Sequence, residues 1–253
     1  MSTTRTGSLV ELAACKELPL HQFTDSATVE WIKTNRPSFP PTRPTPLRTI
    51  TKALVESAAI PTRWLAEPRL ADSIHGHRHG LRTAALAALL ADQHGLDESD
   101  SAVVVIAAAV HDCQRHHDKD DPGHGGRAAV WLAAYADLVW THFHRRPSPT
   151  EVIKAAAAVR LHEVPYEAFT DTDRADHARA ERLCDLVKAA DALDRYRLPK
   201  LSWWPSARHV REPAFDDLLP LAHDLVVISE EAFVAGATSA AAVRYAMAEK
   251  GLV

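Results

Sequence analysis

Cysteine is scarce in this chain, and its copies are not spaced to bind a metal or to build a disulfide framework. Only three occur, none of them in a CxxC pair: Cys15, Cys113 and Cys184. A low and odd count argues against a disulfide scaffold and is typical of a reducing compartment. We therefore expect a cytoplasmic protein.

Long apolar runs are also missing. The longest, residues 102–110, has nine residues, whereas a membrane-spanning helix needs roughly 18 or more. Near the N-terminus, Glu11, Lys16 and Glu17 interrupt any apolar core of a signal peptide. We expect neither a membrane helix nor a secretory leader.

The chain has no excess of positive charge. Its 29 Lys and Arg residues against 33 Asp and Glu residues leave a net charge of −4 with His neutral. A mildly acidic chain lacks the basic surface that grips nucleic acid or an anionic membrane. With 46% hydrophobic and 25% charged residues among 253, the composition is that of a folded domain. The acidic balance disfavours a nuclease that grips a long polymer and favours a small-molecule substrate.

Alternating strand patterns, internal repeats, a Gly-rich phosphate loop and the GxSxG and HExxH motifs are all absent. Helical periodicity and capping signals predict helices over residues 26–33, 51–59, 81–94, 100–110, 124–140, 150–162, 174–195, 215–234 and 238–250. We predict an all-α fold with a helical domain over 49–253. Residues 1–48 form a segment apart, frayed over 1–24 and ending in a Pro-rich arm over 36–48.

Two helices carry distinct signals. Residues 102–110 have no polar face, so we expect that helix to be buried all round, with Ser99 or Asp100 as its N-cap. The sequence Ser-Pro-Thr-Glu over 148–151 is a capping box with proline at the first helical position.

Histidine is the residue that stands out. Eight of the 15 histidines and six of the nine glycines lie between residues 75 and 126. Histidine is the commonest side-chain metal ligand and the usual acid or base near neutral pH.

Three parts of the sequence form a possible set of four metal ligands. His111 and Asp112 end the apolar helix, where a buried charge is costly unless a metal or an ion pair compensates it. A histidine-rich segment that contains His75, His77 and His79 opens a helix about thirty residues upstream, and Asp191 stands among alanines and a leucine on a late helix. Imidazole and carboxylate together suit a divalent first-row ion.

These residues resemble the motifs of the HD-domain metal-dependent phosphohydrolases. The matching pieces are HxxR at 79–82, the His-Asp pair at 111–112, the segment HDCQRHHDKDDPGHGGRAA at 111–129, and ADALDR at 190–195. The resemblance covers about residues 70–200 and implies an HD-domain-like helical bundle. It also implies one divalent transition metal ion (Mn, Fe, Zn or Ni), with two possible, held by His79, His111, Asp112 and Asp191.

Neighbouring residues have more than one interpretation. His75 and His77 read as loop residues or supports for the ligands, and Asp194 as an ion-pair partner of Arg195 or Arg197. His124 and His162 fall in the interval where two-metal members of the superfamily add two histidines. Each could hold a second metal, contact a substrate phosphate, or simply end a helix at the surface.

The resemblance further implies that a metal-activated water hydrolyses a small phosphorylated metabolite or nucleotide, as a monoester or a diester. Asp118 and His116 are candidates for the general base, with Asp121 third, because Arg115 stands where some family members carry a catalytic carboxylate. Predicted phosphate contacts are Arg115, Arg82, Lys119 and Arg195. A group of residues after the last ligand candidate has two interpretations, a pocket that stacks a nucleobase or an aromatic patch in the core or at an interface: Tyr196, Arg197, Trp203 and Trp204.

Two other function classes remain open. The first is a di-iron oxygenase of the same superfamily, which needs six protein ligands and therefore both His124 and His162. The second is a non-catalytic metal-binding regulatory module. The Ala-rich helix over 239–247 could pack internally or form a homodimer.

Overall fold

Helices make up the regular structure of the computed structural model, which describes residues 7–40 and 45–253. These residues contain no β-strand, which confirms the all-α prediction. The α-helices are α1 Leu9–Ala14, α2 Ser26–Thr34, α3 Thr49–Glu56, α4 His77–Gln93, α5 Glu98–Val110, α6 His124–Ala134, α7 Ala136–His142, α8 Pro149–Leu161, α9 Asp171–Arg179, α10 Glu181–Leu193, α11 Phe215–Val234 and α12 Ser239–Glu249. Short 3-10 helices lie at η1 Thr62–Trp64, η2 Pro68–Asp72, η3 Tyr166–Ala168, η4 Asp194–Arg197, η5 Leu201–Trp203 and η6 Ala207–His209. Across the described ranges, no helix is long and apolar enough to cross a membrane.

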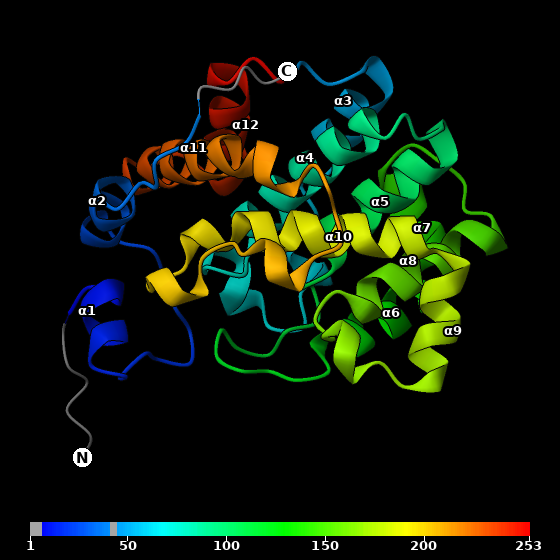
Figure 1. Cartoon of the computed structure of the whole chain (residues 1–253), viewed down its shortest axis with the longest axis horizontal. Helices are drawn as coiled ribbons and strands as arrows, with labels where there is room; N and C mark the ends of the chain where they lie inside the picture. The colour runs from blue at the N-terminus through cyan, green and yellow to red at the C-terminus, as the bar shows by residue number, and fades with distance from the viewer. Residues whose placement is uncertain (1–6, 41–44) are drawn as a thin grey trace.

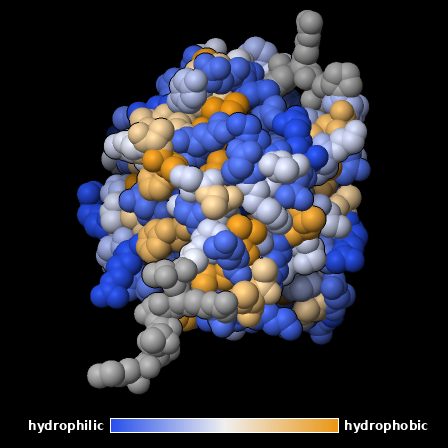
Figure 2. All heavy atoms as spheres, turned by 90° about the vertical axis from the view of Figure 1, so that its left-hand side faces the viewer, coloured by the Kyte–Doolittle hydropathy of each residue, from blue (hydrophilic) through white to orange (hydrophobic). Residues whose placement is uncertain are grey.

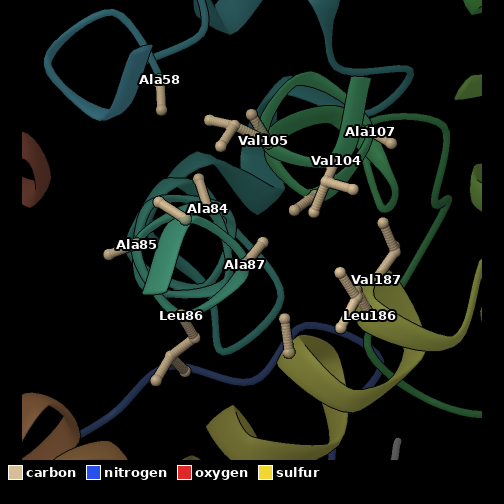
Figure 3. Packing of buried hydrophobic residues seen from close by; sticks show 14 of the residues in the cluster. Ala58, Ala84, Ala85, Leu86, Ala87, Val104, Val105, Ala107, Leu186 and Val187 are labelled. Carbon is tan, nitrogen blue, oxygen red and sulfur yellow. The ribbon is translucent and has the colours of Figure 1, made fainter. Parts of the chain in front are cut away.

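Helices α4 and α5 form the centre of the core. Every residue from Ser101 to Val110 of α5 is buried, as the absence of a polar face predicted. Figure 3 shows Ala84 and Ala87 of α4 beside Val104 and Val105 of α5. Small side chains allow two helix axes to approach closely. This approach brings the first turn of α4 beside the last turn of α5.

Helix α10 crosses this pair and connects it to the rest of the bundle. It contacts α4, α5 and α8, and Figure 1 shows it running in front of α4. Helix α8 contacts α5 on one side and α6 on the other. At the opposite side, α11 and α12 pack against each other and against α4. The Ala-rich helix α12 therefore packs within the chain, and homodimer formation stays a prediction.

The N-terminal segment is more ordered than the sequence predicted. Residues 1–6 lie outside the described ranges, but α1 forms, with a capping box between Ser8 and Glu11. The Pro-rich arm is not helical over 36–40 and 45–48, as predicted, and 41–44 are outside the described residues. Instead of running through solvent, the arm packs on the domain, because Phe39 contacts the ring of Tyr196 and Leu47 is buried.

Several helix boundaries differ from the predicted ones. The N-cap of α5 is Asp97, whose carboxylate accepts from the backbone N–H of Asp100, so Ser99 and Asp100 lie inside the helix. The stretches 124–140 and 174–195 each break into two helices, at Tyr135 and at Ala180. Neither break has a glycine or a proline, so local sequence gave no stop signal.

One face of the molecule shows how polar and apolar residues are distributed at the surface (Figure 2). Figure 2 shows the side of the molecule that carries α1 and α2, where hydrophobic residues are scattered among hydrophilic ones. Single exposed apolar residues of this kind are normal for folded proteins.

Candidate metal centre

Two histidine nitrogens face each other at the α4–α5 contact. Nε2 of His79 lies 2.9 Å from Nε2 of His111, and both residues are fully buried. Nδ1 of His79 lies 2.8 Å from a carboxylate oxygen of Asp194, and Nδ1 of His111 lies 2.7 Å from the carbonyl oxygen of Ala108. These acceptors place the ring protons on Nδ1 and leave a lone pair on each Nε2. Two lone pairs this close repel unless a cation lies between them.

Two carboxylates lie beside His79 and His111, and we call these four residues the first ligand group. An oxygen of Asp191 lies 3.2 Å from His79 Nε2 and 3.7 Å from His111 Nε2. An oxygen of Asp112 lies 3.6 Å from His79 Nε2. Burial lowers the pKa of His111 to about 3, which keeps the imidazole in the neutral form that binds metal. The structure thus brings together His79, His111, Asp112 and Asp191, the four ligands that the resemblance implied.

A second ligand group, formed by His124, His162 and Asp112, shares Asp112 with the first. His124 begins α6 and His162 follows α8, and their Nε2 atoms are 3.0 Å apart. Asp112 Oδ1 lies 2.9 Å from His124 Nε2 and 3.5 Å from His162 Nε2. Nδ1 of His162 lies 2.6 Å from the carbonyl oxygen of Val159, which again leaves the lone pair on Nε2. His124 and His162 are therefore buried beside the predicted ligands rather than at the surface.

The donor set fits metal ions. Ligand atoms of His79, His111 and Asp112 lie within 4.8 Å of one another, as do those of Asp112, His124 and His162. Oδ1 of Asp112 is buried and makes no hydrogen bond. His124 Nε2, at 2.9 Å, and Arg115 Nη1, at 3.6 Å, are nitrogen neighbours of this oxygen, and a buried carboxylate oxygen without a well-aligned donor would be satisfied by a cation. The buried His and Asp groups are thus close enough to bind a metal.

The second group attracts positive charge. Burial alone would lower the pKa of His124, but the carboxylates of Asp112 and Glu163 raise it to about 10. Glu163 also accepts from the backbone N–H of Gly123 and of Gly125. The guanidinium of Arg115 also lies beside this group, since its Nη1 is 3.6 Å from Asp112 Oδ1. Arg115 therefore borders the ligands and cannot serve as a base.

A buried chain of ion pairs supports His79. Asp194, which accepts from His79, also accepts from Nε and Nη2 of Arg82 at 2.6 and 3.1 Å. Nη1 of Arg82 lies 2.7 Å from Glu230, which in turn accepts from Arg78. A carboxylate on the far nitrogen of a ligand histidine fixes its tautomer and ring orientation.

A close contact between α6 and α8 positions the second group. A Cβ atom on Gly125 would lie 2.8 Å from the carbonyl oxygen of Val159 and 3.0 Å from Cε1 of His162. Gly80 has the same role at the first group, because a Cβ there would lie 3.1 Å from the carbonyl oxygen of Ala109. Glycine at both positions lets the ligand-bearing helices approach.

A cavity of about 380 Å³ opens beside the ligand groups. Lining residues that belong to them are Asp112, His124, His162 and Asp191. Charged and aromatic residues on its walls include His75, Arg115, Lys188, Arg195, Arg197, Trp203 and Trp204. A second cavity, of about 530 Å³, lies elsewhere and contains none of the ligand residues.

Some predicted site residues lie outside this cavity. Arg82 is fully buried, with its guanidinium bound to Asp194 and Glu230, so its position does not suit a substrate contact. His116 and Lys119 are exposed and do not line the cavity, and Tyr196 is buried in an aromatic cluster. The carboxylate of Asp121 is held by Arg127.

Asp118 is also enclosed. Its oxygens accept from the backbone of Gln22, the hydroxyl of Ser73 and Nδ1 of His75. Burial raises its pKa. Asp118 is therefore placed to orient the ring of His75, which lines the cavity, rather than to transfer a proton itself. His77 instead lies 3.0 Å from the hydroxyl of Thr62, outside both ligand groups.

Sequence reasoning missed two residues here. Glu163 directly follows His162, and Lys188 lies one helical turn before Asp191, so their proximity to suspected ligands was the available signal. Asp194 pairs mainly with His79 and Arg82 rather than with Arg195, although Arg197 lies 3.6 Å away.

Comparison with known proteins adds no family assignment. The chain matches no family model, no curated protein and no solved structure.

Proposed function

We propose that this protein is a metal-dependent phosphohydrolase of the HD-domain type with two metal ions that share Asp112. The carrying observation is the pair of buried ligand groups that meet at this carboxylate, with Oδ1 of Asp112 2.9 Å from His124 Nε2 and 3.5 Å from His162 Nε2. We assign His79, His111 and Asp191 to the first ion and His124 and His162 to the second. Imidazole and carboxylate donors favour Mn, Fe, Zn or Ni.

The cavity supports a phosphorylated substrate. Its wall carries the cationic side chains of Arg195, Arg197 and Lys188 beside the ligand groups. Guanidinium groups match phosphate oxygens in geometry and charge. Divalent ions in this centre would lower the pKa of a bound water and polarise the phosphoryl group.

His75 is the residue that we propose takes the proton from the attacking water. Its Nδ1 lies 3.0 Å from Asp118, which leaves Nε2 as the free nitrogen of a ring lining the cavity. In the reaction, the water oxygen bonds to phosphorus as the ester P–O bond breaks, and the departing alkoxide gains a proton. Asp118 then acts through His75 by holding its ring.

A di-iron oxygenase is the second candidate, favoured by the six-residue His and Asp ligand set around the shared carboxylate. Oxygen dependence separates the two. Protein stripped of metal and reloaded with Mn, Fe, Zn or Ni is assayed with p-nitrophenyl phosphate and a nucleotide panel, in air and under argon. We expect metal to restore hydrolysis equally in both atmospheres. Products that form only in air would favour the oxygenase.

A double variant tests the ligand assignment. His111→Ala with Asp112→Ala should abolish hydrolysis, while His94→Ala should retain it, because His94 pairs with Glu212 away from the ligand groups. Wild-type turnover by the double variant would refute the proposal.

A further inference from the structure

Arg197 has a buried N–H group that nothing in the described chain satisfies. The residue is 3% exposed and lines the cavity beside the ligand groups. Its Nε donates to the carbonyl oxygen of Ile74 at 2.7 Å, which fixes the guanidinium plane. Its Nη1 makes no hydrogen bond.

The nearest carboxylate does not satisfy this nitrogen. Nη1 lies 3.6 Å from Oδ2 of Asp194, beyond hydrogen-bond distance, and that oxygen is already bound to His79 and Arg82. A buried charged donor without an acceptor is costly, and a ligand, an ion or a water that supplies an acceptor removes that cost. The position in the cavity wall indicates an anionic ligand.

Two further cations strengthen this interpretation. Lys188 donates to the carbonyl oxygens of His162 and Val164 at 2.9 and 2.6 Å, which leaves one of its three N–H groups. Arg195 donates from Nε to the carbonyl oxygen of Trp203. Among the described residues, neither forms an ion pair with a carboxylate. This wall of the cavity therefore carries cationic donors with unused capacity.

We propose that Arg197 binds a terminal phosphoryl oxygen and thereby selects phosphate monoesters over diesters, an inference that rests on the proposed function for its reaction. A monoester presents three terminal oxygens and two negative charges, whereas a diester presents two oxygens and one charge. When a diester binds, one donor in the site is left without an acceptor. Sites built to bond a polar group reject ligands that lack it.

Binding of two non-hydrolysable ligands tests this selection. Phenylphosphonate has three terminal oxygens, and its monomethyl ester has two. Calorimetry measures both dissociation constants for metal-loaded wild type, Arg197→Gln and Arg197→Lys. We expect Arg197→Gln to raise the dissociation constant of phenylphosphonate about 10- to 100-fold and that of the methyl ester less than threefold. The reason is that only phenylphosphonate has the third terminal oxygen whose hydrogen bond to Arg197 is lost. Arg197→Lys keeps the charge without the planar fork and should recover part of the affinity.

Controls separate binding from folding. Arg69→Gln removes the same charge from an exposed 3-10 helix and should leave both constants unchanged. Thermal melting and metal content verify that each variant is folded and loaded. Equal losses for both ligands, or no loss for either, would overturn the proposed selection.

The outcome is separable from that of the proposed function. If the wild type binds phenylphosphonate through Arg197 but hydrolyses no ester, the phosphohydrolase proposal fails and the anion site stands. If it hydrolyses esters and Arg197→Gln keeps the wild-type ratio of monoester to diester kcat/KM, the selection fails and the phosphohydrolase stands.

Discussion

Ring orientation decides what the buried histidines can do. In His79, His111 and His162, Nδ1 faces an oxygen acceptor, and Nε2 faces another ligand atom. Two of these acceptors are backbone carbonyls three residues earlier, at Ala108 and Val159. A histidine directly after a helix can therefore obtain its orientation from the last helical turn. This local geometry explains why His111 and His162 occupy equivalent positions in their groups.

His79 obtains its orientation from a side chain instead, and this dependence can be tested. We predict that Asp194→Asn weakens metal binding at the first group about 10- to 100-fold, because the ring loses its carboxylate partner. The free energy of unfolding should also fall by about 3 kcal/mol, since Arg82 keeps only Glu230 as a charged partner. Metal titration followed by calorimetry measures the first effect, and denaturant unfolding measures the second.

Asp185→Asn is the matched control for this variant. Asp185 lies on α10, the helix that ends just before Asp194, and accepts from His177, a buried histidine outside both ligand groups. Its substitution should reduce stability and leave metal affinity within about twofold of wild type. Equal losses of metal affinity in both variants would show that the effect of Asp194 is only a loss of folding.

At the scale of helices, two close approaches bring the candidate ligands together. The α4–α5 contact brings His79 to His111, and the α6–α8 contact brings His124 to His162. Helix α10 crosses the first pair and adds Asp191. The apolar pattern of α5 predicted a buried helix, but nothing in one sequence specifies which partner it meets.

The α6–α8 contact can be perturbed at one atom. We predict that Gly125→Ala removes the second ion and keeps the first, because the new Cβ would collide with the carbonyl of Val159 and the ring of His162. The collision should also cost about 1–3 kcal/mol of stability. Elemental analysis after dialysis against metal-free buffer measures the bound ions.

Gly126→Ala supplies the control on the same helix. A Cβ at Gly126 meets nothing within 4 Å. Alanine should therefore stabilise α6 by about 0.5–1 kcal/mol and leave both ions bound. Retention of both ions at wild-type affinity by Gly125→Ala would contradict the account of this contact.

At the scale of the whole molecule, a single carboxylate joins the Pro-rich arm to the C-terminal helices. Asp224 on α11 accepts from Arg36 of the arm and from Lys250 after α12. Burial opposes ionisation, but hydrogen bonds from His223, Arg36 and Lys250 bring the pKa of Asp224 well below its usual range. The arm is thereby held on the domain.

This linkage predicts a pH dependence. Because the folded pKa of Asp224 is depressed, its stabilisation is fully present above the unfolded value of about 3.9 and is lost as pH falls below it. Asp224→Asn should lower the free energy of unfolding by about 1 kcal/mol at pH 7. This difference in unfolding free energy between variant and wild type should decrease steadily below about pH 4. Asp171→Asn, which removes a fully exposed carboxylate, should have no such effect. A difference for Asp224→Asn that is constant between pH 7 and pH 3 would contradict this.

The sequence predicted the helical class for physical reasons, and it predicted the grouping of its strongest ligand candidates from burial together with the resemblance to HD-domain motifs. The nine-residue apolar run ending at His111 required burial, and Asp191 stood among apolar neighbours. Interactions between distant segments were not predictable. Examples are the enclosure of Asp118 by Gln22 and Ser73, and the pairing of Arg82 with Glu230, which is 148 residues away. Helix breaks at Tyr135 and Ala180 likewise lack any local signal.

Metal content is the most direct test of the account, because every step depends on two ligand groups that share Asp112. Elemental analysis of protein purified without chelators or a histidine tag, and then exposed to Mn, Fe, Zn or Ni, counts the ions. We predict about two per chain for the wild type and at most one for His162→Ala. A wild-type chain that binds one ion, or takes up none when metal is added, would contradict the shared two-metal centre.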